Sequence, residues 1–134
     1  MKTDSFKFES KDSVKIAAKS WLPDAKPKAI VQILHGMAEH IGRYHDFATE
    51  LVKNGYGVYG NDHRGHGGNV GSEKDFSFFG VDQGWEKVVD DAHALTLLIK
   101  NKHDSVPVFL YGHSMGSSVS RNYIIKYNNE KLQG

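Results

Sequence analysis

The chain has 134 residues, of which 39% are hydrophobic and 25% charged, and its formal net charge is +1. This length and composition are typical of one globular domain with a substantial core. The small net charge gives no support for nucleic acid or an anionic membrane as a partner. With no cysteine in the sequence, a disulfide framework and thiolate metal sites are excluded. A polar N-terminus and the lack of a long apolar run predict a cytoplasmic protein with no transmembrane segment.

The first part of the chain predicts three strands. Polar and apolar residues alternate over 5–10 and over 14–20, with a short polar turn between them, which is typical of an antiparallel pair. The segment PDAKPK at 23–28 is a polar, proline-marked connection. Residues 29–34, AIVQIL, are almost continuously apolar, as in a strand that is covered on both faces.

Helical and strand patterns alternate in the rest of the chain. Apolar residues recur at helical spacing over 44–52, 85–99 and 115–127, and short strand patterns lie at 56–59 and 107–111. A leading hairpin followed by this alternation predicts an α/β fold, with parallel strands and helices on both faces. Ligands of such sheets bind beyond the carboxyl ends of the strands, where HGMAEH, NDHRGHGG and GHSMG begin.

The segment GHSMG places Ser114 between Gly112 and Gly116. The pattern G-x-S-x-G is weak alone, but here it joins an apolar strand pattern to a helical pattern. That is the context of a nucleophile elbow, in which strand and helix pass too closely for side chains at the two glycines. We therefore interpret Ser114 as a catalytic nucleophile. The alternative is that the glycines only make a tight turn and that Ser114 caps the helix.

A serine that attacks a carbonyl group also needs two N–H donors for the oxyanion. One donor is expected to be the backbone N–H of Met115, the residue after the nucleophile. The other is expected in the loop after the first parallel strand, where Gly36 permits an unusual turn and Met37 offers its N–H. His35 and His66 are expected to hold their loops by hydrogen bonds, and His113 to be a packing or orienting group rather than the base of the serine.

Other motifs are set aside. GYGVYG at 55–60 matches a dinucleotide-binding pattern, but it follows a helix and enters a strand, so no nucleotide site is predicted. The eight histidines lie mostly in loops, and we predict neither a metal site nor a cofactor. Asp62 and Arg64 are expected to brace their loop, and Asp90 and Asp91 to form a solvated helix face.

Three segments, HGMAEHIGRY, NDHRGHGGNVGSE and GHSMGS, occur in an order and spacing that resemble the monoacylglycerol lipase and lysophospholipase branch of the α/β-hydrolases. The resemblance covers nearly the whole chain. It implies that Ser114 matches the family nucleophile and that Met37 and Met115 match its oxyanion-hole donors. It also implies hydrolysis of monoacyl lipid esters without a metal or organic cofactor. The sequence departs from the family at 68–69, where a serine or threonine is common.

In this fold the triad acid and histidine follow the serine in chain order. The twenty residues after Ser114 contain no histidine and no aspartate. We therefore expect residues 1–134 to be the N-terminal part of a single α/β-hydrolase domain, ending before the sixth strand, the lid and the triad acid and histidine. The chain alone is then expected to be inactive.

The strand at 107–111 should be central in such a domain, so we expect it to leave a bare edge rich in Val108, Phe109 and Leu110. An exposed apolar edge invites aggregation or pairing with another chain. Two alternatives to the ester hydrolase remain. One is a non-catalytic binding domain that kept the elbow for packing, and the other is an aminopeptidase-like hydrolase of the same fold.

Overall fold

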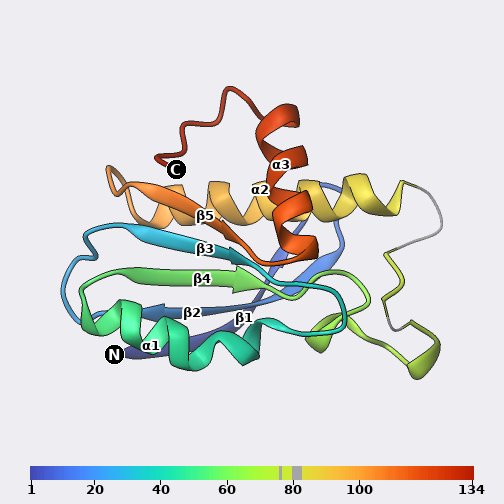
Figure 1. Cartoon of the computed structure of the whole chain (residues 1–134), viewed down its shortest axis with the longest axis horizontal. Coiled ribbons are helices and arrows are strands. Elements are labelled where there is room, and N and C mark those ends of the chain that lie inside the picture. The colour runs from blue at the N-terminus through green and yellow to red at the C-terminus, as the bar shows by residue number, and fades with distance from the viewer. Residues whose placement is uncertain (76, 80–82) are drawn as a thin grey trace.

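The structure is a computed structural model, and it describes residues 1–75, 77–79 and 83–134. Its centre is a five-stranded sheet with the order β1-β2-β4-β3-β5, drawn in Figure 1. The strands are β1 (Lys2–Glu9), β2 (Lys15–Leu22), β3 (Ile30–Leu34), β4 (Gly57–Asn61) and β5 (Val108–Gly112). The α-helices are α1 (His45–Lys53), α2 (Gly84–Lys102) and α3 (Met115–Lys126), and the short 3-10 helices are η1 (Ile41–Tyr44), η2 (Gly67–Asn69) and η3 (Glu73–Asp75).

The pairing of the strands confirms the predicted fold class. β1 and β2 form the expected antiparallel hairpin, and β2 also pairs antiparallel with β4. β3 lies between β4 and β5 and is parallel to both. The carboxyl ends of β4, β3 and β5 therefore meet at one edge of the sheet, and their loops come together there.

Helices cover both faces of the sheet, as the alternating side chains of β3 require. Ile33 and its neighbours pack under α1, together with Ala48 and Val52. Residues 30 and 34 of β3 point the other way, into clusters with α2 and α3. Gln32 lies on that second face, fully buried, and its side chain is bonded to the Ala92 carbonyl at 2.8 Å. No α-helix among residues 1–75, 77–79 and 83–134 is long and apolar enough to cross a membrane.

The edge of β5 differs from the bare edge expected from the sequence. Gln133 donates its backbone N–H to the Val108 carbonyl at 2.8 Å, and Leu110 donates its N–H to the Gly134 carbonyl at 2.8 Å. Figure 1 shows the C-terminus lying beside β5 accordingly. The expectation was therefore wrong for the backbone groups of Val108 and Leu110, because the chain turns back after α3. The side chain of Phe109 on this strand remains exposed.

The expected solvated face at the start of α2 is also wrong. Asp91 is completely buried and accepts hydrogen bonds from Arg64 Nε at 2.8 Å and from the Ser10 hydroxyl. Asp90 accepts a hydrogen bond from the Tyr127 hydroxyl. The reason is tertiary: the β1–β2 turn and the loop after β4 fold over Asp91, and the end of α3 lies against Asp90. Arg64 also pairs with Asp12 of that turn, so it braces its loop as predicted.

Candidate active site

The elbow between β5 and α3 has the backbone that a nucleophile serine requires. Ser114 has φ of 53° and ψ of −120°, a conformation that residues with a side chain rarely adopt and that costs free energy. Its side chain is exposed at the amino end of α3 and makes no capping hydrogen bond. The alternative in which Ser114 serves as a helix cap is therefore wrong. This backbone instead leaves the side chain of Ser114 exposed at the junction of β5 and α3.

The two flanking glycines are required by close contacts. A Cβ at Gly116 would lie 1.9 Å from the backbone oxygen of Leu34 at the end of β3. A Cβ at Gly112 would lie 2.5 Å from both the Gly116 oxygen and the Ser120 hydroxyl. Strand and helix thus pass as closely as the sequence pattern predicted. This contact seats Ser114 directly over the carboxyl ends of β3 and β5.

The loop after β3 lies against the serine. A Cβ at Gly36 would be 3.2 Å from the Cβ of Ser114. The backbone N–H groups of Met37 and Met115 have no hydrogen-bond partner within the described parts of the chain. The structure therefore brings the predicted oxyanion loop next to the elbow and leaves an unpaired donor in each. Met37 itself has an exposed side chain.

The loop is held in place by side chains. Gly36 donates its N–H to Glu39 Oε1 at 2.5 Å, and its carbonyl accepts a hydrogen bond from His35 Nδ1 at 2.7 Å. Ala38, which has a φ of 57°, donates its N–H to His66 Nε2 at 3.1 Å. The expectation that His35 and His66 hold their loops is thus met in the hydrogen-bond geometry.

Three histidines form a buried cluster beneath this loop. The ring centroids of His35 and His63 are 4.1 Å apart, and those of His35 and His66 are 5.4 Å apart. His35 Nε2 accepts the His63 N–H at 3.0 Å, while the His63 ring donates from Nε2 to the His35 carbonyl at 2.9 Å. Burial lowers the pKa of His35, and burial together with the neighbouring His35 lowers the pKa of His63 to about 3. Both rings are therefore neutral at physiological pH.

Glu39 is a site residue that the sequence analysis missed. Besides the Gly36 N–H, its carboxylate accepts the Tyr44 hydroxyl at 2.7 Å and lies 3.4 Å from His113 Nδ1. Burial alone would raise the pKa of Glu39, but the hydrogen bonds from Gly36 and Tyr44 lower it, so the group is ionised. A signal was present in the segment EHIGRY, where Arg43 follows Glu39 by four residues and Tyr44 by five. In the structure Arg43 Nη1 lies 3.7 Å from Glu39 Oε2. The ring of His113 faces this carboxylate and is largely exposed.

The arrangement suits attack on a carbonyl carbon. An exposed hydroxyl at a helix amino terminus stands beside two unpaired N–H groups, and such donors stabilise the negative charge of a tetrahedral intermediate. Among the described residues no side chain is hydrogen-bonded to the Ser114 hydroxyl, so none of them is placed as its base. Nor do these residues contain a group of three histidine or acidic side chains arranged to hold a metal ion.

Known proteins resemble this chain over most of its length. A family model described as serine aminopeptidase, S33, matches residues 25–134. A monoacylglycerol lipase of Mycolicibacterium smegmatis is 36% identical over 126 residues, which cover 92% of this chain and 42% of the relative. A monoglyceride lipase homolog of monkeypox virus is 40% identical over 109 residues, covering 81% of this chain and 37% of the relative. The chain thus spans about two fifths of the length of these curated relatives.

Solved structures agree with these relatives. A highly thermostable carboxyl esterase from Bacillus coagulans, in complex with glycerol, is 30% identical with a TM-score of 0.86, over 100% of this chain and 43% of the esterase. A soluble variant of the monoglyceride lipase from Saccharomyces cerevisiae shares the fold, with a TM-score of 0.77 at 23% identity over 99% of this chain and 42% of the lipase. With its hairpin, parallel strands and glycine-flanked serine, the chain belongs to the α/β-hydrolases, in the family described as serine aminopeptidase, S33, and is similar to monoglyceride lipases.

Proposed function

We propose that this chain carries the nucleophile and the oxyanion hole of a serine ester hydrolase that acts on monoacyl lipid esters, such as monoacylglycerols and lysophospholipids. The observation that carries the proposal is the backbone of Ser114, with its φ of 53° and ψ of −120°. A folded chain keeps such strain where the exposed group has a use. The unpaired N–H groups of Met37 and Met115 beside it support the same reaction.

In the proposed mechanism the Ser114 hydroxyl oxygen attacks the ester carbonyl carbon while its proton passes to a histidine base. The carbonyl oxygen becomes negative and accepts hydrogen bonds from the N–H groups of Met37 and Met115. The intermediate collapses, the ester bond breaks, and the alcohol leaves with the proton from the base. Water then attacks the acyl-serine, giving the fatty acid and restoring the hydroxyl.

The base and the acid are proposed to lie in polypeptide outside residues 1–134. Two observations support this placement. His35, His63 and His66 are buried and their hydrogen bonds hold loops, so they are poor candidates for a base that must reach the serine. The matched relatives are also more than twice as long as the matched region. In this fold the acid and histidine follow the nucleophile.

We also propose that a further strand of the same domain, outside residues 1–134, extends the pairing that Gln133 and Gly134 begin on β5. Between β5, α3 and this segment lies a groove with a volume of about 370 Å³, lined in part by Leu110, Ile124 and Tyr127. A following strand and helix of the same domain would cover these apolar side chains. Residues 1–134 would then be the N-terminal part of a single α/β-hydrolase domain, inactive without the rest.

The proposed substrate class is supported by the relatives that are named monoacylglycerol or monoglyceride lipases. The description of the matched family favours a second candidate, an aminopeptidase-like hydrolase of the same fold. The elbow and oxyanion hole serve both reactions, since an ester and an amide both pass through a tetrahedral intermediate. The choice depends on pockets for the acyl and leaving groups, and a direct comparison of substrates decides it.

The test uses the complete hydrolase, its Ser114→Ala variant and a Ser118→Ala control, which alters another exposed serine on α3. We expect Ser114→Ala to lower p-nitrophenyl butyrate turnover by about 10⁴-fold or more without loss of folding, and Ser118→Ala to have no effect. Retained activity in Ser114→Ala would show that this serine is not the nucleophile. Among monoacylglycerol, lysophosphatidylcholine and aminoacyl-anilide, we expect hydrolysis of the first two.

Each other outcome overturns one part of the proposal. A preference for the anilide would favour the aminopeptidase, and hydrolysis of none of these substrates would favour a binding domain. The 134-residue chain alone is expected to show no turnover above its own Ser114→Ala variant. Serine-dependent turnover by the chain alone would mean that a histidine within it serves as the base.

A further inference from the structure

In the loop after β3, the backbone N–H groups on either side of Met37 are hydrogen-bonded to side chains, whereas the Met37 N–H is not. The Gly36 N–H is bonded to Glu39, and the Ala38 N–H is bonded to His66. Of the three consecutive amides 36 to 38, only the middle one has no partner among the described residues. The proposed oxyanion donor thus lies between two tethered peptide units.

We propose that His66 is a positioning residue for the Met37 N–H, an inference that rests on the function proposed above. The bond from Ala38 to His66 Nε2 fixes the plane of the peptide that follows Met37. Ala38 has a φ of 57°, which is unfavourable for an alanine, so the loop needs an external contact to keep this turn. His66 supplies that contact from the neighbouring loop after β4.

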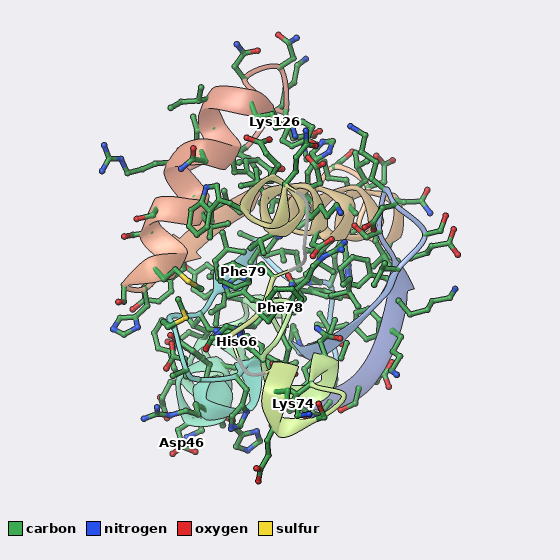
Figure 2. All side chains as sticks on the ribbon, turned by 90° about the vertical axis from the view of Figure 1, so that its right-hand side faces the viewer. Asp46, His66, Lys74, Phe78, Phe79 and Lys126 are labelled. Carbon is green, nitrogen blue, oxygen red and sulfur yellow. The ribbon has the colours of Figure 1, made fainter. Side chains whose placement is uncertain are left out.

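The ring of His66 is itself held in a single orientation. It is 3% exposed, and its Nδ1 donates a hydrogen bond to the Arg64 carbonyl at 2.9 Å. That bond places the ring proton on Nδ1, which leaves Nε2 as the acceptor that Ala38 requires. The ring of Phe79 stacks on it with centroids 5.8 Å apart and planes 19° apart; both residues are labelled in Figure 2.

Arg64 connects this contact to the body of the fold. Its guanidinium is bonded to the buried Asp91 on α2 and to Asp12 in the β1–β2 turn. The carbonyl that accepts the hydrogen bond from His66 therefore belongs to a residue whose side chain is held by two carboxylates. A series of hydrogen bonds thus connects Asp91 of α2 to Arg64, Arg64 to His66, and His66 to Ala38 in the loop after β3. His66 acts through the backbone and does not touch the substrate.

The test compares three substitutions that separate hydrogen bonding from packing. His66→Leu fills much of the space but removes the acceptor. His66→Gln keeps an oxygen at about the reach of Nε2, and His66→Asn has an oxygen that is too short to reach Ala38. If the hydrogen bond to Ala38 positions the loop, His66→Gln should behave like the wild type, whereas His66→Leu and His66→Asn should both show the loss. His40→Leu, a change at an exposed histidine in the loop after β3, is the control.

The first readout is activity of the complete hydrolase. We expect His66→Leu and His66→Asn to lower kcat by about 10- to 100-fold with little change in KM, because the lost stabilisation belongs to the transition state. His66→Gln is expected to recover most of kcat, and His40→Leu to leave it unchanged. A loss confined to KM, or an absence of rescue by Gln, would overturn the positioning role.

The second readout does not depend on catalysis. Amide hydrogen exchange of Ala38, followed by NMR in the full chain, should be about five- to tenfold faster in His66→Leu or His66→Asn than in the wild type, and normal in His66→Gln. Unchanged exchange in all variants would overturn the inference. If Ser114 proves not to be the nucleophile while the exchange pattern holds, the proposed function fails and the loop contact stands. Should His66→Leu not fold, the Asn and Gln pair gives the same comparison.

Discussion

The strained backbone of Ser114 leads to a prediction about stability that is independent of any substrate. Replacing the serine by glycine removes the Cβ that makes φ of 53° and ψ of −120° unfavourable. Ser114→Ala removes the same hydroxyl but keeps the Cβ and its strain. We therefore expect Ser114→Gly to be more stable than Ser114→Ala, although glycine destabilises most positions in a folded protein.

The magnitude follows from two opposing contributions. A residue with a side chain in such a backbone region costs about 1–3 kcal/mol, which glycine recovers. Glycine gains about 0.5–1 kcal/mol of extra freedom in the unfolded chain, which acts against it. The expected net advantage of Ser114→Gly over Ser114→Ala is about 1 kcal/mol, or roughly 3–4 °C in Tm for a domain of this size.

The assay is urea unfolding of both variants, followed by circular dichroism, with the slope m checked for constancy. Ser118 provides a control of opposite sign, because it is exposed within α3. We expect Ser118→Gly to be less stable than Ser118→Ala by about 1 kcal/mol, as in any helix interior. If Ser114→Gly is equal to or less stable than Ser114→Ala while the Ser118 pair behaves as expected, the serine backbone is not strained.

Two further predictions concern packing and pH. Gly116→Ala should lower the free energy of unfolding by about 1–3 kcal/mol or more in urea titrations, because its Cβ would meet the Leu34 backbone at 1.9 Å. Stability should also fall as the pH drops below the usual histidine pKa of 6.5, since the folded chain holds the pKa of His63 at about 3 and the unfolded chain then binds more protons. The slope is up to about 1.4 kcal/mol per pH unit for each such histidine, and urea midpoints at pH 7 and pH 5 measure it.

Each of these has its own control. The Cβ of Gly42→Ala would meet side-chain atoms of His40 and Lys19 and no backbone atom, so this change should affect stability far less than Gly116→Ala. Equal effects at the two glycines would contradict the close contact between α3 and β3. For the pH effect, carboxylates with lowered pKa values act only nearer pH 4, so the interval from pH 7 to pH 5 reports histidines. A urea midpoint that stays constant there would mean that His63 is not buried in its neutral form.

Local patterns in the sequence were enough for the elements that surround the candidate site. The hairpin, the alternation of strands and helices and the sharp turn at Ser114 were all predicted, because each depends on residues within a few positions of one another. The glycines on either side of Ser114 predicted that strand and helix pass closely, and in the structure this close contact lies between Gly116 and Leu34. The carboxyl-end loops were expected to meet for a topological reason, since parallel strands end at the same edge.

Tertiary structure alone decided which distant groups became partners. Nothing near Asp91 in the sequence distinguishes it from a surface aspartate, and only the folding of the loop after β4 over α2 buries it against Arg64. His66 likewise became the partner of the Ala38 N–H because the loops after β3 and β4 meet in space. The return of Gln133 to β5 is a third case. Burial and hydrogen bonding of polar groups depend on contacts between segments far apart in the chain, and no local pattern encodes those contacts.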